Sequence, residues 1–142
     1  MTDTRDCFEK GLLKKDIPSP ELARKSLKQA EFFLKEAFDM IELEKKELAV
    51  ISLYNSFFHV ARALLFRDGI KERSHFCVAR YIESEYTKKD LLNPLFLNAF
   101  ETLMNQRKTI QYSTEKTIID ENLSEFYNIC EKFMLVVEGM VK

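Results

Sequence analysis

Tyr54-Asn-Ser-Phe-Phe-His-Val-Ala-Arg-Ala-Leu-Leu65 is the centre of the most apolar stretch of the chain, and it decides the fold. In and around it, apolar residues recur at the spacing of helical turns: Val50, Tyr54, Phe57, Ala61 and Leu64. This spacing predicts a helix that ends near Arg67, where Asp68-Gly69 provides a stop. Because apolar residues surround most of the helix circumference, we place this helix at the centre of a helical bundle.

A long amphipathic helix of about 25 residues precedes the central one. Its apolar positions follow one another at spacings of 4, 3, 4, 3 and 4 residues: Ala23, Leu27, Ala30, Leu34, Ala37 and Ile41. Ser19 followed by Pro20 is typical of an N-cap with proline at the first helical position. The charged break over residues 44–47 is short, so the two helices are expected to form an antiparallel hairpin.

Three further helices are predicted after Gly69. Ser74 caps a short helix that ends before residues 88–90, and the next helix runs from about Pro94 to Ile110. Residues 112–118 have the composition of a loop. The last helix repeats the 4, 3 spacing: Leu123, Tyr127, Cys130, Met134, Val137 and Val141. We therefore predict an all-α fold, an up-and-down bundle of four to five helices, as a single domain over residues 19–142. Residues 1–18 are expected to form a charged N-terminal extension with room for a short helix.

The bulk composition excludes several classes of protein. With 22 basic and 23 acidic residues the net charge is -1, so general DNA binding is not expected. The three cysteines form no CxxC pair and the two histidines have no ligand spacing, so neither a metal site nor a disulfide framework is predicted. No signal peptide, membrane span or cofactor is expected. The expected compartment is the cytoplasm, with the cysteines reduced.

A cation interrupts the apolar stripe of the predicted helix from Pro94. Arg107 lies in line with Phe96, Phe100 and Leu103. One interpretation is a structural ion pair, with Glu101, Glu115 or Glu125 as the partner. The other is a ligand, which Gln111, one turn further on, would help to hold. Tyr112 would lie about 140 degrees from Arg107 in an unbroken helix, so it reaches this site only if the helix ends there or if a second subunit supplies it.

One polar stripe runs along the central helix. Its members lie within about 120 degrees of one another. They are Ser52, Asn55, Ser56, His59 and Arg62. The stripe is either the solvated edge of the helix or a polar face at a dimer interface or ligand groove. His59 taken alone is more often a structural histidine than a catalytic base. No glycine-rich phosphate loop, GxSxG or HExxH motif is present.

Three segments together resemble the HEPN family (higher eukaryotes and prokaryotes nucleotide-binding domain), in its small stand-alone prokaryotic and archaeal form. Residues 54–65 resemble the family's aYYAxFxAaraLL helix. Ser74-His75 is similar to the pair that opens its next helix, and residues 107–112 resemble its closing motif. The resemblance covers about residues 20–140 and implies the family's helical bundle.

In the ribonuclease branch of that family the closing motif is Arg, four to six residues, then His. The resemblance places Arg107 at the arginine, but Tyr112 stands at the histidine position and no histidine follows. A phenol is a poor general base near neutral pH, so an enzyme of this kind is not expected. The Arg-x4-Tyr form resembles the branch paired with minimal nucleotidyltransferases in toxin-antitoxin-like systems. That resemblance implies a homodimer with a shared cleft, and makes Tyr112 a conceivable acceptor of nucleotide transfer.

Three functions follow as hypotheses. The first is a homodimeric module that binds a nucleotide or an RNA phosphate and partners a nucleotidyltransferase. Its ligand-binding residues would be Arg107, Gln111, Tyr112, Asn55, His59, Arg62 and His75. The second is a metal-independent endoribonuclease toxin in which His59 or His75 replaces the missing base. The third is a helical interaction scaffold without a ligand.

Overall fold

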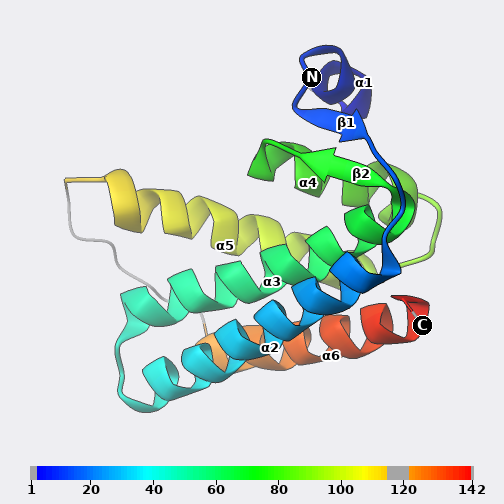
Figure 1. Cartoon of the computed structure of the whole chain (residues 1–142). Helices are drawn as coiled ribbons and strands as arrows, with labels where there is room; N and C mark the ends of the chain where they lie inside the picture. The colour runs from blue at the N-terminus through cyan, green and yellow to red at the C-terminus, as the bar shows by residue number, and fades with distance from the viewer. Residues whose placement is uncertain (1–2, 115–121, 142) are drawn as a thin grey trace.

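The computed structural model describes residues 3–114 and 122–141, which form a helical bundle with a very small sheet (Figure 1). The six α-helices are α1 (Thr4–Glu9), α2 (Pro20–Glu42), α3 (Lys46–Asp68), α4 (His75–Ile82), α5 (Pro94–Tyr112) and α6 (Leu123–Val141). A π-helical turn, η1 (Glu83–Thr87), continues α4, and two short strands are β1 (Leu13–Lys15) and β2 (Ile70–Glu72). The predicted all-α bundle is confirmed.

The α2–α3 hairpin forms as predicted. Ser19 Oγ accepts a hydrogen bond from the backbone N–H of Leu22 at 3.1 Å and so caps α2. The two helices lie side by side and run in opposite directions (Figure 1). At the end of α3, Gly69 has a φ of 76°, and a Cβ there would lie 2.6 Å from the carbonyl oxygen of Asp16. Only glycine fits this stop, because both the backbone angle and the close approach exclude a side chain.

Helix α3 is the central helix. It packs against α2, α4, α5 and α6, and most of its apolar residues are fully buried. Its 23 residues are long enough to cross a membrane, and its most apolar window has a mean hydropathy of 1.4, but 72% of that window is buried inside the structure. A core helix of a bundle has this character, because its neighbours surround it.

The polar stripe of α3 does not follow the solvent edge throughout. Ser52 and Ser56 are buried, and Ser56 Oγ donates a hydrogen bond to the carbonyl oxygen of Ala30 in α2 at 2.8 Å. Ser56 therefore belongs to the contact between α2 and α3, and the solvated-edge interpretation is wrong for both buried serines. Only the other three members, Asn55, His59 and Arg62, remain partly exposed.

The two strands were not predicted. β1 pairs with β2 in antiparallel register, with Leu13 opposite Glu72 and Lys15 opposite Ile70. Each strand has three residues, too few to show an alternating pattern. The pair fastens the N-terminal segment to the connection between α3 and α4, so α1 and β1 lie at one end of the bundle (Figure 1).

The prediction that all the cysteines are reduced is wrong for two of them. Cys7 in α1 and Cys77 in α4 form a disulfide between residues 70 positions apart. The wide separation and the absence of a CxxC pair hid this bond, because the two elements meet through tertiary contacts, namely the β1–β2 pairing and the packing of α1 against α4. Cys130 is free and buried, and burial raises the pKa of its thiol to about 12, so it is not a nucleophile.

The remaining helices begin where their caps predict. Ser74 Oγ accepts from the N–H of Cys77 at 3.2 Å, and Asn93 Oδ1 accepts from the N–H of Leu95 at 2.9 Å, directly before Pro94 at the first position of α5. Helix α5 continues to Tyr112, two residues beyond the predicted end. Of the predicted loop at residues 112–118, residues 115–118 lie outside the described residues.

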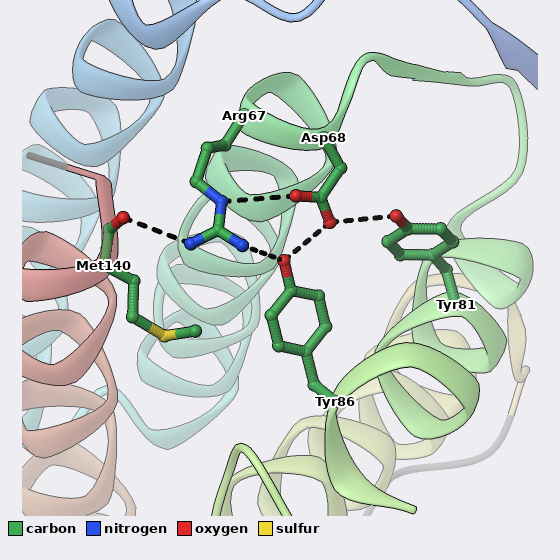
Figure 2. Close-up of polar contacts among 5 residues, drawn as sticks. All are labelled: Arg67, Asp68, Tyr81, Tyr86 and Met140. Carbon is green, nitrogen blue, oxygen red and sulfur yellow. Dashed lines mark hydrogen bonds and ion pairs between the residues drawn. The ribbon is translucent and has the colours of Figure 1, made fainter. Parts of the chain in front are cut away.

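A network of hydrogen bonds joins the C-terminal end of α3 to its neighbours (Figure 2). Arg67 donates from Nη1 to the carbonyl oxygen of Met140 in α6 and from Nη2 to the hydroxyl of Tyr86. Asp68 Oδ2 accepts from Tyr81 at 2.8 Å and from Tyr86 at 2.6 Å. Burial, together with these bonds to Asp68, raises the pKa of both tyrosines, so both stay protonated. The network joins α3, α4, η1 and α6 and keeps Arg67 occupied.

Candidate functional site

Arg107 lies where the buried stripe of α5 meets α3. Phe96, Phe100 and Leu103 are buried, and Arg107 continues their line as a partly exposed residue. Its guanidinium carbon lies 4.6 Å from the centre of the Tyr54 ring of α3, which is a cation–π contact. The core-facing stripe therefore ends in a cation held against an aromatic ring.

The charge of Arg107 is not neutralised within the described residues. Its Nη1 donates to Gln111 Oε1 at 2.9 Å, and its buried Nε has no hydrogen-bond partner there. Glu101, the first expected partner, is paired with Arg80 instead, and Glu125 forms no ion pair with Arg107, although both residues are described. Those two ion-pair hypotheses are therefore wrong, and Glu115, the third, lies outside the described residues. A partly buried guanidinium without a counterion favours the approach of an anion.

His75 approaches the same tyrosine from the first residue of α4. Its Nδ1 lies 2.6 Å from the Tyr54 hydroxyl, and the direction of that hydrogen bond depends on the histidine tautomer. The imidazole stacks on Phe58 with ring centres 4.0 Å apart, while the residue remains exposed. We call Arg107, Gln111, Tyr54 and His75 the Arg107 site. Three helices, α3, α4 and α5, each contribute to it.

The Arg107 site has one positive charge and two neutral polar rings at neutral pH. Burial raises the pKa of Tyr54 to about 12, against the opposing effect of Arg107. Burial lowers the pKa of His75, and Arg107 lowers it further. The site can therefore offer an anion one guanidinium and one uncharged imidazole.

His59 and Arg62 lie on the next part of the α3 surface, beyond Phe58. The His59 ring is parallel to Phe33 of α2 with centres 5.5 Å apart, and its Nδ1 is buried without a described partner. Arg62 pairs with Glu72 of β2 at 2.5 Å and stacks on Phe66. A hollow of about 270 Å³ beside them is lined by Leu22, Lys25, Ser26, Gln29, His59, Arg62 and Phe66. The charge of Arg62 is already compensated, so it is a weaker anion-binding group than Arg107.

Acid is expected to destabilise the fold through His59. Burial, with Arg62 and His75, lowers its pKa from 6.5 to about 4. Between these values the unfolded chain binds more protons than the folded one, so the free energy of unfolding falls as the pH falls below about 6.5. The loss is expected to be on the order of 1 kcal/mol at pH 5, because the imidazole is only partly buried and solvent screens part of the effect. Urea unfolding at pH 7 and pH 5 measures it, and His59→Gln should reduce it. An unchanged loss in that variant would contradict the assignment.

The structure separates the predicted site residues into groups. It joins Arg107, Gln111 and His75 around Tyr54, and it places His59 and Arg62 beside the hollow, with Asn55 partly exposed on the same helix. Tyr112 is helical and 76% exposed, and it does not join the Arg107 site within one protomer. Sequence reasoning missed Tyr54 as a member of the Arg107 site and Phe58 as the ring on which His75 stacks. The signal was their position in the motif of residues 54–65, within the same predicted bundle as the helix that carries Arg107.

Comparison with known proteins gives one family. The family model described as HEPN domain matches residues 23–140, a range that includes all of the Arg107 site. No curated protein matches the chain significantly.

Proposed function

The chain belongs to the HEPN domain family, and from this premise we propose that it binds the phosphate of a nucleotide or of RNA in the Arg107 site. The observation that carries the proposal is the guanidinium of Arg107, held on the Tyr54 ring with no carboxylate partner in the described part of the chain. Arginine offers several N–H donors in a planar fork that matches phosphate oxygens. Phosphate binding would compensate a charge that has no carboxylate partner among residues 3–114 and 122–141.

His75 and Gln111 support the same ligand class. The imidazole of His75 is neutral near pH 7 and the residue is exposed, so the ring nitrogen that does not bond to Tyr54 can contact a ligand. Gln111 orients the guanidinium through Nη1. Asn55, His59 and Arg62 extend this surface along α3, where a longer nucleic acid would continue beyond the first phosphate.

We propose that the active form is a homodimer in which the Arg107 sites of two copies face one cleft. Tyr112 supports this arrangement, because 76% of its surface is exposed and no contact within the described residues joins it to its own Arg107 site. In a dimer it would supply a stacking face to the partner's ligand. Light scattering at micromolar concentration should give the mass of two chains, and a monomeric mass would contradict the proposal.

The partner we propose is a minimal nucleotidyltransferase, in a toxin-antitoxin-like pair. The support is the Arg-x4-Tyr form of the closing motif, which resembles the branch paired with such enzymes. Co-expression with a nucleotidyltransferase encoded by an adjacent gene should give a stable complex in gel filtration. If no such gene adjoins this one, or if the two proteins elute separately, the pairing is wrong.

Calorimetric titration of the wild type tests the binding proposal. ATP, GTP and a short single-stranded RNA would be titrated at two salt concentrations. Saturable binding that weakens as salt rises is expected, because phosphate contacts release counterions. No heat of binding with any of the three ligands would refute the proposal.

A second candidate function is metal-independent RNA cleavage, and the observation that favours it is the position of His75. The motif histidine is absent, but His75 shares Tyr54 with Arg107 and is neutral, as a general base must be. Cleavage of a mixed RNA pool in EDTA, lost in both His75→Ala and Arg107→Ala, would establish it. An intact RNA pool after hours leaves the binding proposal as the function.

A further inference from the structure

A long groove runs between α2 and α6, on a part of the molecule that the Arg107 site does not use. The two helices lie side by side in Figure 1. One section has a volume of about 390 Å³ and a second section about 220 Å³, and Glu31 lines both. From Arg24 to Phe38 the groove follows α2 for about 21 Å, or roughly four helical turns.

The floor of the groove is apolar, and two large side chains remain open at its edges. Leu27, Leu34 and Met134 are buried residues that line it. Phe38 is 48% exposed and Leu135 is 63% exposed, and both line the larger section. Removing such an apolar surface from water is favourable, so a ligand that covers it with apolar groups would be stabilised.

The two edges of the groove have opposite charge. Arg24, Lys28 and Lys35 lie along α2, with Glu31 as the one acidic residue among them. Glu131 and Glu138 lie along α6. Within residues 3–114 and 122–141 none of these side chains forms an ion pair, although the two edges face each other across one groove. The charges are therefore too far apart to neutralise each other directly.

We propose that this groove binds one amphipathic helix of a partner protein. An apolar stripe at positions i, i+3, i+4 and i+7 would cover the floor. Acidic side chains on one flank would face α2, and basic side chains on the other flank would face α6. A helix of this kind fits both the length of the groove and the opposite charges of its edges. The inference does not depend on phosphate binding in the Arg107 site.

Two other occupants fit the groove less well. A second copy related by twofold symmetry would place groove against groove, which leaves the floors of both unfilled. An anionic membrane surface would be attracted by the α2 edge but repelled by Glu131 and Glu138 on the α6 edge. A single helix is convex and fills the groove floor, and a helix with acidic side chains on one flank and basic side chains on the other is repelled by neither edge.

Three blocked peptides of about 16 residues test the charge pattern, since this length spans the groove. All three have the same leucine stripe. The mixed peptide has Glu on one flank of the stripe and Lys on the other, the Glu-only peptide has Glu on both flanks, and the Lys-only peptide has Lys on both flanks. Fluorescence anisotropy should show that the mixed peptide binds the wild type most tightly, in the micromolar range. The double variant Lys28→Glu/Lys35→Glu should instead prefer the Lys-only peptide. Lys25→Glu, on α2 but outside the groove, should keep the wild-type order.

Leu135→Glu tests the apolar floor and edge, and it should weaken the mixed peptide by roughly tenfold. The matched control is Val136→Glu, an exposed neighbour that does not line the groove. Both variants should keep the wild-type circular dichroism spectrum. Equal affinity for all three peptides, no binding, or an equal loss in Val136→Glu would overturn the proposal. So would a dimer that only Leu135→Glu dissociates, since the occupant would then be a second copy.

Discussion

Replacing Arg107 with alanine is expected to weaken the binding of a short RNA by roughly 30-fold and to change the free energy of unfolding by no more than about 1 kcal/mol. The loss of binding corresponds to about 2 kcal/mol, typical of a charge-assisted hydrogen-bonded contact. Stability is little affected because Arg107 has no carboxylate partner in the described residues and only one cation–π contact.

Two further variants sharpen this comparison. Lys108→Ala removes the same charge from the neighbouring exposed position of α5 and should reduce binding far less. Arg107→Lys keeps the charge but loses the planar fork, so it should fall between the wild type and Arg107→Ala. Equal binding by wild type and Arg107→Ala would exclude the Arg107 site. A loss of several kcal/mol in stability would instead support the scaffold hypothesis, with Arg107 in a structural ion pair.

Breaking the Cys7–Cys77 disulfide is expected to lower the free energy of unfolding by about 2–4 kcal/mol. The bond joins residues 70 positions apart, so its loss restores much conformational freedom to the unfolded chain. It also fastens α1 to α4, whose first residue is His75. Urea unfolding of Cys7→Ser and Cys77→Ser measures the effect.

Reducing agent supplies the control for the disulfide prediction. It should destabilise the wild type and leave the double variant Cys7→Ser/Cys77→Ser unchanged. Limited proteolysis should then cut the reduced protein first in residues 3–18, because this segment loses its covalent link to α4 and keeps the non-covalent contacts of α1 and the short β1–β2 pairing. A wild type with the same stability in both conditions would contradict the prediction.

The helices could be predicted from local patterns, whereas the connections between distant segments could not. The 4, 3 spacing predicted α2, α3 and α6. Ser19 and Ser74 marked the beginnings of α2 and α4 correctly, and Gly69 marked the end of α3. The β1–β2 pair, the disulfide and the network of Arg67 with Asp68 depend on residues brought together only by tertiary packing. No single segment contains the information that Arg67 bonds to Met140, 73 positions away.

The candidate site divides in the same way. Arg107 was recognisable as a cation on an apolar stripe, and Gln111 followed from one helical turn. Tyr54 was missed as its platform, because the rotation of α3 relative to α5 is a tertiary property. The ion pair of Arg62 with Glu72 was also hidden, since it depends on the position of β2. Sequence reasoning therefore identified the cation, but it did not identify the neighbouring side chains that determine whether this cation can bind an anion.

The most direct test of the central claim is the ¹H–¹⁵N spectrum of the arginine Nε–Hε groups during titration with a short RNA. The Arg107 signal, identified by its absence in Arg107→Lys, should shift saturably with the RNA concentration. The Arg67 and Arg80 signals should stay in place, because both side chains are held by internal bonds. RNA binding that leaves the Arg107 signal unmoved, or no binding at all, would contradict the account.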